Sequence, residues 1–227
     1  MTVENGLAFV GHMDAPDGTT IIDVKDPSNP KILKQIFLDD GLSHTHKVRV
    51  AGNLMITNVE QAQRHLLRRG ENLPEVSDQL ASSLGRPPND SEIAAALGLP
   101  ENKLRDVRQF LKNGYNDGGF RVWDVSDPSN PDLLSYVRTH GFGVHRFDMD
   151  ENYAYISTEM EGYVGNILVI YDLADPKKPV EVSRWHMPGQ HIAAGEKPSW
   201  KGYKNRLHHA LRVGNELWAA VWNAGFQ

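Results

Sequence analysis

Three histidines occupy equivalent places in repeated stretches of the chain, and each has a carboxylate or amide side chain fourteen residues after it. The three pairs are His46 with Glu60, His145 with Glu159, and His209 with Asn223. Neutral imidazoles beside carboxylates suit a divalent transition metal such as Zn, Mn, Fe or Cu, with open positions for water or substrate. Because such a metal lowers the pKa of bound water, the pattern predicts a metal-dependent enzyme, most simply a hydrolase, acting on a small organic molecule.

Each residue of the predicted site has an expected role. The predicted metal ligands are His46, His145, His209 and His12. His12 is included because Ala8–Met13 aligns with the strand residues that lead up to Glu159, and His208 competes with His209 as a ligand. Glu60 or Glu159 is expected to act as a ligand or general base. Arg146 is expected to neutralise a substrate carboxylate.

A Gly-rich loop over residues 189–205 precedes the third histidine. Long loops inside compact folds are often functional, so this loop is expected to form a pocket wall or lid. The expected substrate or lid residues are His191, Glu196 and Asn223. The alternative is that the loop is a variable connection between strands.

A non-catalytic interpretation of the repeated histidines stays open. A repeated histidine also serves as a hydrogen-bonding group that ties strands together, and a fold by itself does not indicate catalysis. On that interpretation the chain is an interaction scaffold that presents its loops and an inserted helical segment to a protein partner.

The histidines lie at the start of segments that predict strands. In each segment apolar and polar residues alternate with period two, and a short polar turn and a second such run follow. If the hairpins fold about Asn53, Asn152 and Glu216, the two members of each His pair become cross-strand neighbours. Directly opposed side chains have Cβ atoms about 4.5–5.5 Å apart, so each pair would lie within reach of one ligand.

A second repeated element separates two further strands. Its copies are Asp23–Pro30, Asp124–Pro131 and Asp172–Pro179, each with an apolar run before and after it. Two prolines three residues apart after Asp make a stiff polar turn, because each ring fixes φ and removes a donor. One unit is thus four short strands, which predicts a mainly β fold, a β-propeller of four-stranded blades. If the histidine strand is innermost, the equivalent histidines converge at one mouth of the central channel.

These units resemble LVIVD-repeat β-propeller proteins. The run Ile167–Asp172 is similar to the run that gives the repeat its name, and the Asp-Pro turn follows it as in that family. The resemblance implies a propeller fold and leaves the activity open.

The spacing of the Asp-Pro turns reveals an insertion. Asp124 and Asp172 are 48 residues apart, whereas Asp23 and Asp124 are 101 apart. The predicted organisation is residues 1–60 as a partial blade and the start of a second, 61–115 as a lid-like helical insertion, and 116–227 as the remaining blades. Asp90 or Ser91 is the expected N-cap of one inserted helix.

The stretch Leu84–Leu104 within the insertion resembles the helix-turn-helix of region three in bacterial sigma factors. Such a motif implies DNA contact through its second helix. The insertion has nearly as many acidic as basic residues, which argues against nucleic acid as a partner, because DNA affinity rests on phosphate neutralisation.

Composition limits the remaining possibilities. The chain has 227 residues, no cysteine and a formal net charge of −5, which excludes disulfides, thiolate catalysis and thiolate-ligated metal. It has no apolar run of about eighteen residues and no signal peptide at its start, so a cytoplasmic protein without a membrane partner is expected.

Without the insertions, three to four blades are present. We therefore expect an incomplete propeller that is marginally stable or self-associates through its open edges.

Overall fold

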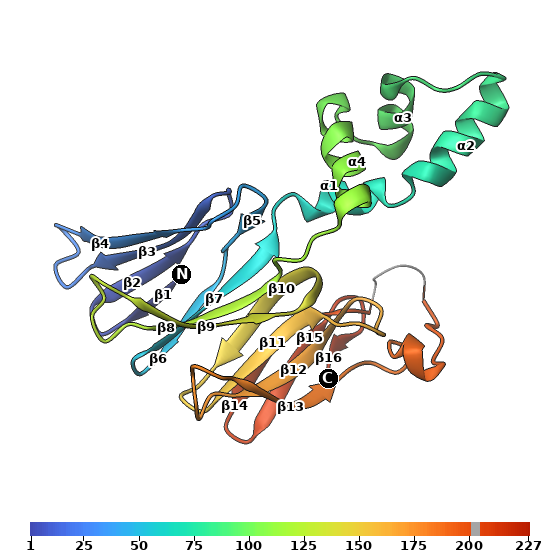
Figure 1. Cartoon of the computed structure of the whole chain (residues 1–227). Coiled ribbons are helices and arrows are strands. Elements are labelled where there is room, and N and C mark those ends of the chain that lie inside the picture. The colour runs from blue at the N-terminus through green and yellow to red at the C-terminus, as the bar shows by residue number, and fades with distance from the viewer. Residues whose placement is uncertain (201–204) are drawn as a thin grey trace. The chain divides into compact units, whose positions relative to one another are not determined.

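The computed structural model describes residues 1–200 and 205–227, so the end of the predicted loop at 201–204 lies outside the described residues. The chain divides into two compact units (Figure 1). One consists of residues 1–62 and 116–227 and is built of antiparallel strands, and the other consists of residues 63–115 and is helical.

The Asp-Pro repeats form tight turns between adjacent antiparallel strands, as predicted. In the first turn the backbone N–H of Asn29 donates to the Asp26 carbonyl at 3.0 Å, and the Asp26 carboxylate accepts from the Ser28 N–H at 3.0 Å. The same two hydrogen bonds recur around Asp127 and around Asp175. The repeated sequence therefore encodes a repeated turn geometry.

These turns join the outer two strands of three four-stranded blades, and the second and third blades are hydrogen-bonded to each other in one nine-stranded sheet. The first blade contains β1 (Thr2–Glu4), β2 (Leu7–Gly11), β3 (Asp17–Asp23) and β4 (Lys31–Phe37). The second contains β6 (Val48–Ala51), β7 (Leu54–Gln61), β8 (Gly119–Asp124) and β9 (Asp132–Arg138), and β5 (Ser43–His44) pairs with the end of β7. The third contains β10 (His140–Met149), β11 (Tyr153–Glu159), β12 (Asn166–Asp172) and β13 (Val180–Trp185).

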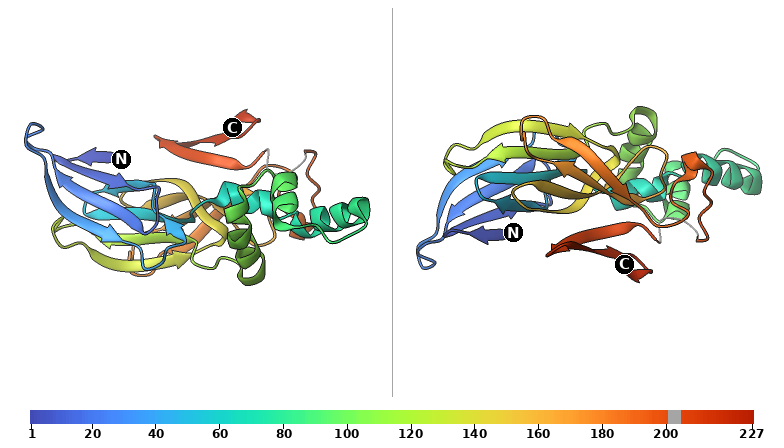
Figure 2. Two further views of the ribbon diagram at one scale, coloured as in Figure 1. Left: turned by 90° about the horizontal axis from the view of Figure 1, so that it is seen from above. Right: turned by 90° about the horizontal axis from the view of Figure 1, so that it is seen from below.

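A further three-stranded sheet follows the third blade. It contains β14 (Leu207–Val213), β15 (Glu216–Val221) and β16 (Gly225–Phe226), after a short 3₁₀ helix at Ile192–Ala194. Both views of Figure 2 show this sheet as a separate layer, and β14 lies against β10, β11 and β12. The fold is thus mainly β with propeller-type blades, as the sequence predicts.

The strands that carry the repeated histidines lie innermost. The first strands of consecutive blades contact one another, β1 with β6, β6 with β10 and β10 with β14. Apolar side chains of the second and third blades fill the space between these two blades, among them the fully buried Ile56, Phe120 and Ile156. This packing fixes the ends of β7 and β10, where the candidate site lies.

The helical unit contains four α-helices, and a 3₁₀ turn at Glu101–Lys103 precedes the last of them. The helices are α1 (Arg64–Gly70), α2 (Leu73–Leu84), α3 (Asp90–Leu97) and α4 (Leu104–Asn113). The N-cap of α3 is Asn89 and not Asp90 or Ser91 as predicted, because Asn89 and Glu92 form a reciprocal capping box. The lid role predicted for this unit stays a prediction. Within the described residues, no helix has the length and apolar character needed to cross a bilayer.

Candidate metal centre

Glu60 is the centre of the candidate site. It lies near the end of β7, pairs with His44 of β5 on one side and with Gly143 of β10 on the other, and is only 1% exposed. Gly143 has a φ of 88°, and a Cβ on it would lie 2.4 Å from the Val59 carbonyl oxygen. Glycine is therefore required for β10 to approach β7 closely enough to enclose the carboxylate.

Three histidines surround the Glu60 carboxylate. His44 Nε2 lies 3.2 Å and His46 Nδ1 lies 3.5 Å from Oε2. His145 Nδ1 lies 3.1 Å from Oε1 and 3.3 Å from Oε2. The rings of His44 and His46 meet edge to face with centroids 4.7 Å apart, and His46 and His145 are 5.5 Å apart. Side chains from two consecutive blades thus converge on one buried carboxylate.

The hydrogen bonds of His44 define which of its nitrogens carries a proton. Its Nδ1 lies 3.0 Å from the carbonyl oxygen of Met13, which can only accept, so Nδ1 donates. In the neutral ring Nε2 then has a lone pair, and this lone pair faces Glu60 Oε2. Two electron-rich atoms in such contact require a cation between them, either a proton or a metal ion.

The hydrogen bonds of Asn58 define which ring nitrogen of His46 carries no proton. Its Oδ1 accepts from the Lys47 N–H at 2.8 Å, and its Nδ2 donates to the Val144 carbonyl at 2.8 Å. The same Nδ2 lies 3.1 Å from His46 Nδ1, which is therefore the acceptor and carries no proton. The single lone pair of Nδ1 therefore accepts from Asn58, and the same nitrogen lies 3.5 Å from Glu60 Oε2.

Burial keeps His46 neutral. It lowers the pKa of His46 to about 3, and the attraction of the Glu60 carboxylate only partly opposes this effect. A neutral imidazole is the form that binds metals, so the site is poised for ligation at neutral pH.

The cluster continues into the last sheet through His208, not His209. The His208 ring meets that of His145 edge to face at 5.2 Å and also contacts Trp222 at 5.0 Å. Burial, followed by repulsion from Arg146, lowers the pKa of His208 to about 4. His209 Nε2 instead donates to the Phe147 carbonyl at 3.2 Å. Of the two neighbours that competed in sequence, His208 is the one beside the cluster.

Several other predicted site residues have partners outside the cluster. His12 Nε2 lies 2.8 Å from Thr20 Oγ1, and Asn223 lies in the exposed turn before β16. Glu159 accepts from the Phe142 N–H at 3.1 Å. Glu196 accepts from the backbone N–H groups of Gly189 and His191 and so fixes its own loop.

His191 lies in the same loop as Glu196. Its ring stacks on that of Tyr163, with centroids 4.3 Å apart.

The predicted cross-strand pairs are wrong in register. Glu60 is opposite His44, Glu159 is opposite His140, and His209 is opposite Ala220. The main cause is the position of the turns, which lie closer to the histidines than predicted, with Ala51 opposite Leu54, Met149 opposite Ala154 and Val213 opposite Glu216. In the third blade, shifts before and after Val144 displace Glu159 further, and the fourteen-residue spacing does not reveal them.

His44 is the functional candidate that sequence reasoning missed. His44 has no copy in the other blades, so the repeat pattern does not predict it. The available signal was its distance of two residues from His46, since alternate residues of an extended segment share a face.

Comparison with known families matches both units. The LVIVD repeat matches residues 3–39, 114–139 and 148–186, and sigma-70 region 3 matches residues 68–115. The chain carries LVIVD repeats. They coincide with strands of the three four-stranded blades, and the predicted propeller resemblance is confirmed. The sigma-70 region 3 match coincides with the helical unit. No curated protein matches the chain.

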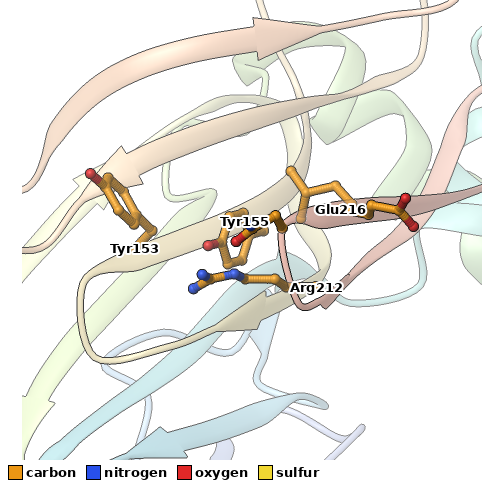
Figure 3. A pocket seen from close by; sticks show the side chains of 6 residues that line it. Tyr153, Tyr155, Arg212 and Glu216 are labelled. Carbon is orange, nitrogen blue, oxygen red and sulfur yellow. The ribbon is translucent and has the colours of Figure 1, made fainter.

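The LVIVD-repeat unit also has a hollow of about 220 Å³ beside the turn between β14 and β15 (Figure 3). Tyr153, Tyr155, Arg212 and Glu216 line it. Arg212 is ion-paired with Asp150, which also accepts from the Tyr155 hydroxyl at 2.8 Å. The positive charge of Arg212 is therefore already neutralised by Asp150.

Proposed function

We propose that the chain binds a divalent transition metal through His44, His46 and Glu60 and uses it in a hydrolytic reaction on a small organic molecule. The observation that carries the proposal is the buried Glu60 carboxylate with one ring nitrogen of His44 and one of His46 within 3.5 Å of Oε2. Ligand atoms of these three residues lie within 4.8 Å of one another.

The distances suit a metal ion. Ligands of a tetrahedral zinc with bonds of about 2.0–2.1 Å lie about 3.3 Å from one another. The two His-to-Glu60 Oε2 distances, 3.2 and 3.5 Å, bracket this value. Three protein ligands leave a fourth position for water, which is the arrangement of catalytic rather than structural zinc sites. Ligation at His46 Nδ1 would replace its contact with Asn58.

The surrounding groups of the chain support this chemistry. His44 donates through Nδ1 to the Met13 carbonyl, which orients Nε2 toward the site. His145 donates to Glu60 and holds the carboxylate in place, as a positioning residue. A bound metal would supply a water of lowered pKa.

Metal content tests the proposal directly. After expression with Zn, Mn, Fe and Cu supplied, elemental analysis of the purified chain is expected to show about one metal ion per chain. His44→Ala and Glu60→Gln each remove a ligand and are expected to lower the content severalfold. His140→Ala, at an exposed histidine outside the cluster, is the matched control and is expected to keep the metal.

Catalysis needs its own readout. Hydrolysis of p-nitrophenyl esters and phosphates is expected to be lost with a chelator and in His44→Ala. Absence of metal in the wild-type chain would contradict the proposal and leave a proton shared between His44 and Glu60 as the cation. If the chain contains metal but hydrolyses none of these substrates, only the proposed reaction is contradicted and the metal site is not.

A further inference from the structure

A second polar hollow lies where the innermost strands of three blades meet. It has a volume of about 120 Å³. Lys47 and Arg49 line it from the β6 segment, Arg146 from β10 and His209 from β14. Three permanent cations and an imidazole thus surround a space equal to about four water molecules in the liquid.

Two of these cations lack a counter-charge. Arg49 Nε is paired with Asp148 Oδ1 at 3.4 Å. Among residues 1–200 and 205–227, by contrast, neither Lys47 nor Arg146 forms an ion pair, and the Nε of Arg146 is buried without a hydrogen-bond partner. Glu60 attracts both, but its carboxylate already accepts from His145.

The cations also disfavour one another. Lys47, Arg49 and Arg146 line the same small hollow, and the side chains of Lys47 and Arg146 are only partly exposed. Half-buried like charges are costly unless something of opposite charge lies between them. Arg212, which lines the hollow of Figure 3, by contrast has Asp150 as its ion-pair partner.

We propose that this pocket binds a small oxyanion, the carboxylate or phosphate group of a ligand, between Lys47 and Arg146. The pocket, of about 120 Å³, has room for one such group. Arg offers a planar set of donors and Lys a point charge, which together suit a tetrahedral or planar oxyanion. Lys47 and Arg146 directly follow His46 and His145, so the anion would lie beside the candidate metal centre and mark the substrate as anionic.

Titration of the full chain with inorganic phosphate and, separately, with acetate tests this proposal. Calorimetry is carried out with a chelator present and at constant ionic strength against chloride. Saturable binding of either anion is expected, and which of the two binds more tightly identifies the group. No saturable heat from either anion at millimolar concentration would overturn the proposal.

Variants locate the binding. The double variant Lys47→Gln with Arg146→Gln is expected to weaken the tighter anion at least about tenfold, because it removes both charge-assisted contacts. Lys31→Gln with Lys178→Gln removes the same charge at exposed positions and is expected to keep the affinity. Equal affinity in the two double variants would overturn the assignment.

Thermal melting separates binding from a structural role. Without anion the pocket variant is expected to melt no lower than wild type, since it relieves repulsion, and phosphate should raise the melting temperature of wild type alone. If the double variant fails to fold, the single variants Lys47→Gln and Arg146→Gln take its place, and an unchanged affinity in both would overturn the proposal. His44→Ala is expected to keep anion binding while losing metal, so failure of the anion pocket and failure of the metal centre are distinguishable.

Discussion

At the scale of single residues, the candidate site depends on which ring nitrogens carry protons. Met13 and Asn58, neither of which bears a charge, determine that His44 Nε2 and His46 Nδ1, the ring nitrogens nearest Glu60, are the ones without a proton in the neutral rings. The backbone carbonyl and the side-chain amide therefore do as much to create a ligand set as the histidines do. Neither contact is visible from residue types, because Met13 and Asn58 are 31 and 12 residues from their partners.

The depressed pKa of His46 predicts a pH dependence of stability in the metal-free chain. The unfolded chain takes up a proton at His46 near pH 6.5, whereas the folded chain does so only near pH 3. Stability is therefore expected to fall as the pH drops from about 6.5 toward 3, by at most about 1.4 kcal/mol per pH unit for this one proton. Urea unfolding of wild type and His46→Gln at several pH values, with chelator, measures it.

His46→Gln is expected to have the shallower slope, because its side chain can still accept from Asn58 but does not titrate. His140→Gln is the control and should keep the wild-type slope. Parallel stability curves for wild type and His46→Gln would show that burial does not control this histidine.

At the scale of elements, the helical unit is inserted between two strands that are already hydrogen-bonded neighbours. The register of β7 and β8 runs without a break from Leu54 opposite Asp124 to Val59 opposite Gly119. The chain thus leaves and re-enters the second blade at adjacent points. Insertions at such points are tolerated because the blade does not need them to pair its strands.

Replacing residues 63–115 by Asn-Gly is therefore expected to leave the blade intact. The shortened chain should keep a β-type circular dichroism spectrum, cooperative melting and the metal content of wild type, since the proposed ligands lie outside the deleted segment. Loss of cooperative melting would show that the helices support the blade. If the chain is instead an interaction scaffold, the deletion should remove partner binding and leave the metal-free fold unchanged.

At the scale of the whole propeller unit, one sheet face is apolar and uncovered. The inner face of the last sheet packs Leu207 and Ala219 against Tyr155 and Leu168. On its other face Trp218 is 51% and Phe226 is 73% exposed. Leu211 and Val213 also lie on that face, because Leu211 is opposite Trp218 in the register. Contiguous exposed apolar surface of this kind favours association.

We accordingly predict that the chain self-associates through this face. Sedimentation velocity is expected to show a mass that rises with protein concentration, and Trp218→Lys is expected to shift the distribution toward monomer. Ile32→Lys introduces the same charge at an exposed apolar position of the first blade and serves as the control. A monomer at every concentration would contradict the prediction.

The sequence predicts the blades well and the site only in part, for physical reasons. The Asp-Pro turns are local, so three copies suffice to place strands on both sides of each turn. The site depends on register: the hairpins turn closer to the histidines than predicted, the shifts around Val144 displace Glu159 further, and His145 contacts Glu60 of the preceding blade. A bulge is set by packing between blades, which a spacing of fourteen residues does not encode.

The position of Glu60 between two repeats has a consequence for how such a site could arise and be lost. The histidines around Glu60 come from two neighbouring repeats: His44 and His46 belong to one and His145 to the next. A duplicated blade carries the parts of the site but not the site itself, which exists only where two non-identical copies meet. The site therefore depends on differences between the copies rather than on what they share. A metal bound there would also depend on the correct packing of the two neighbouring repeats.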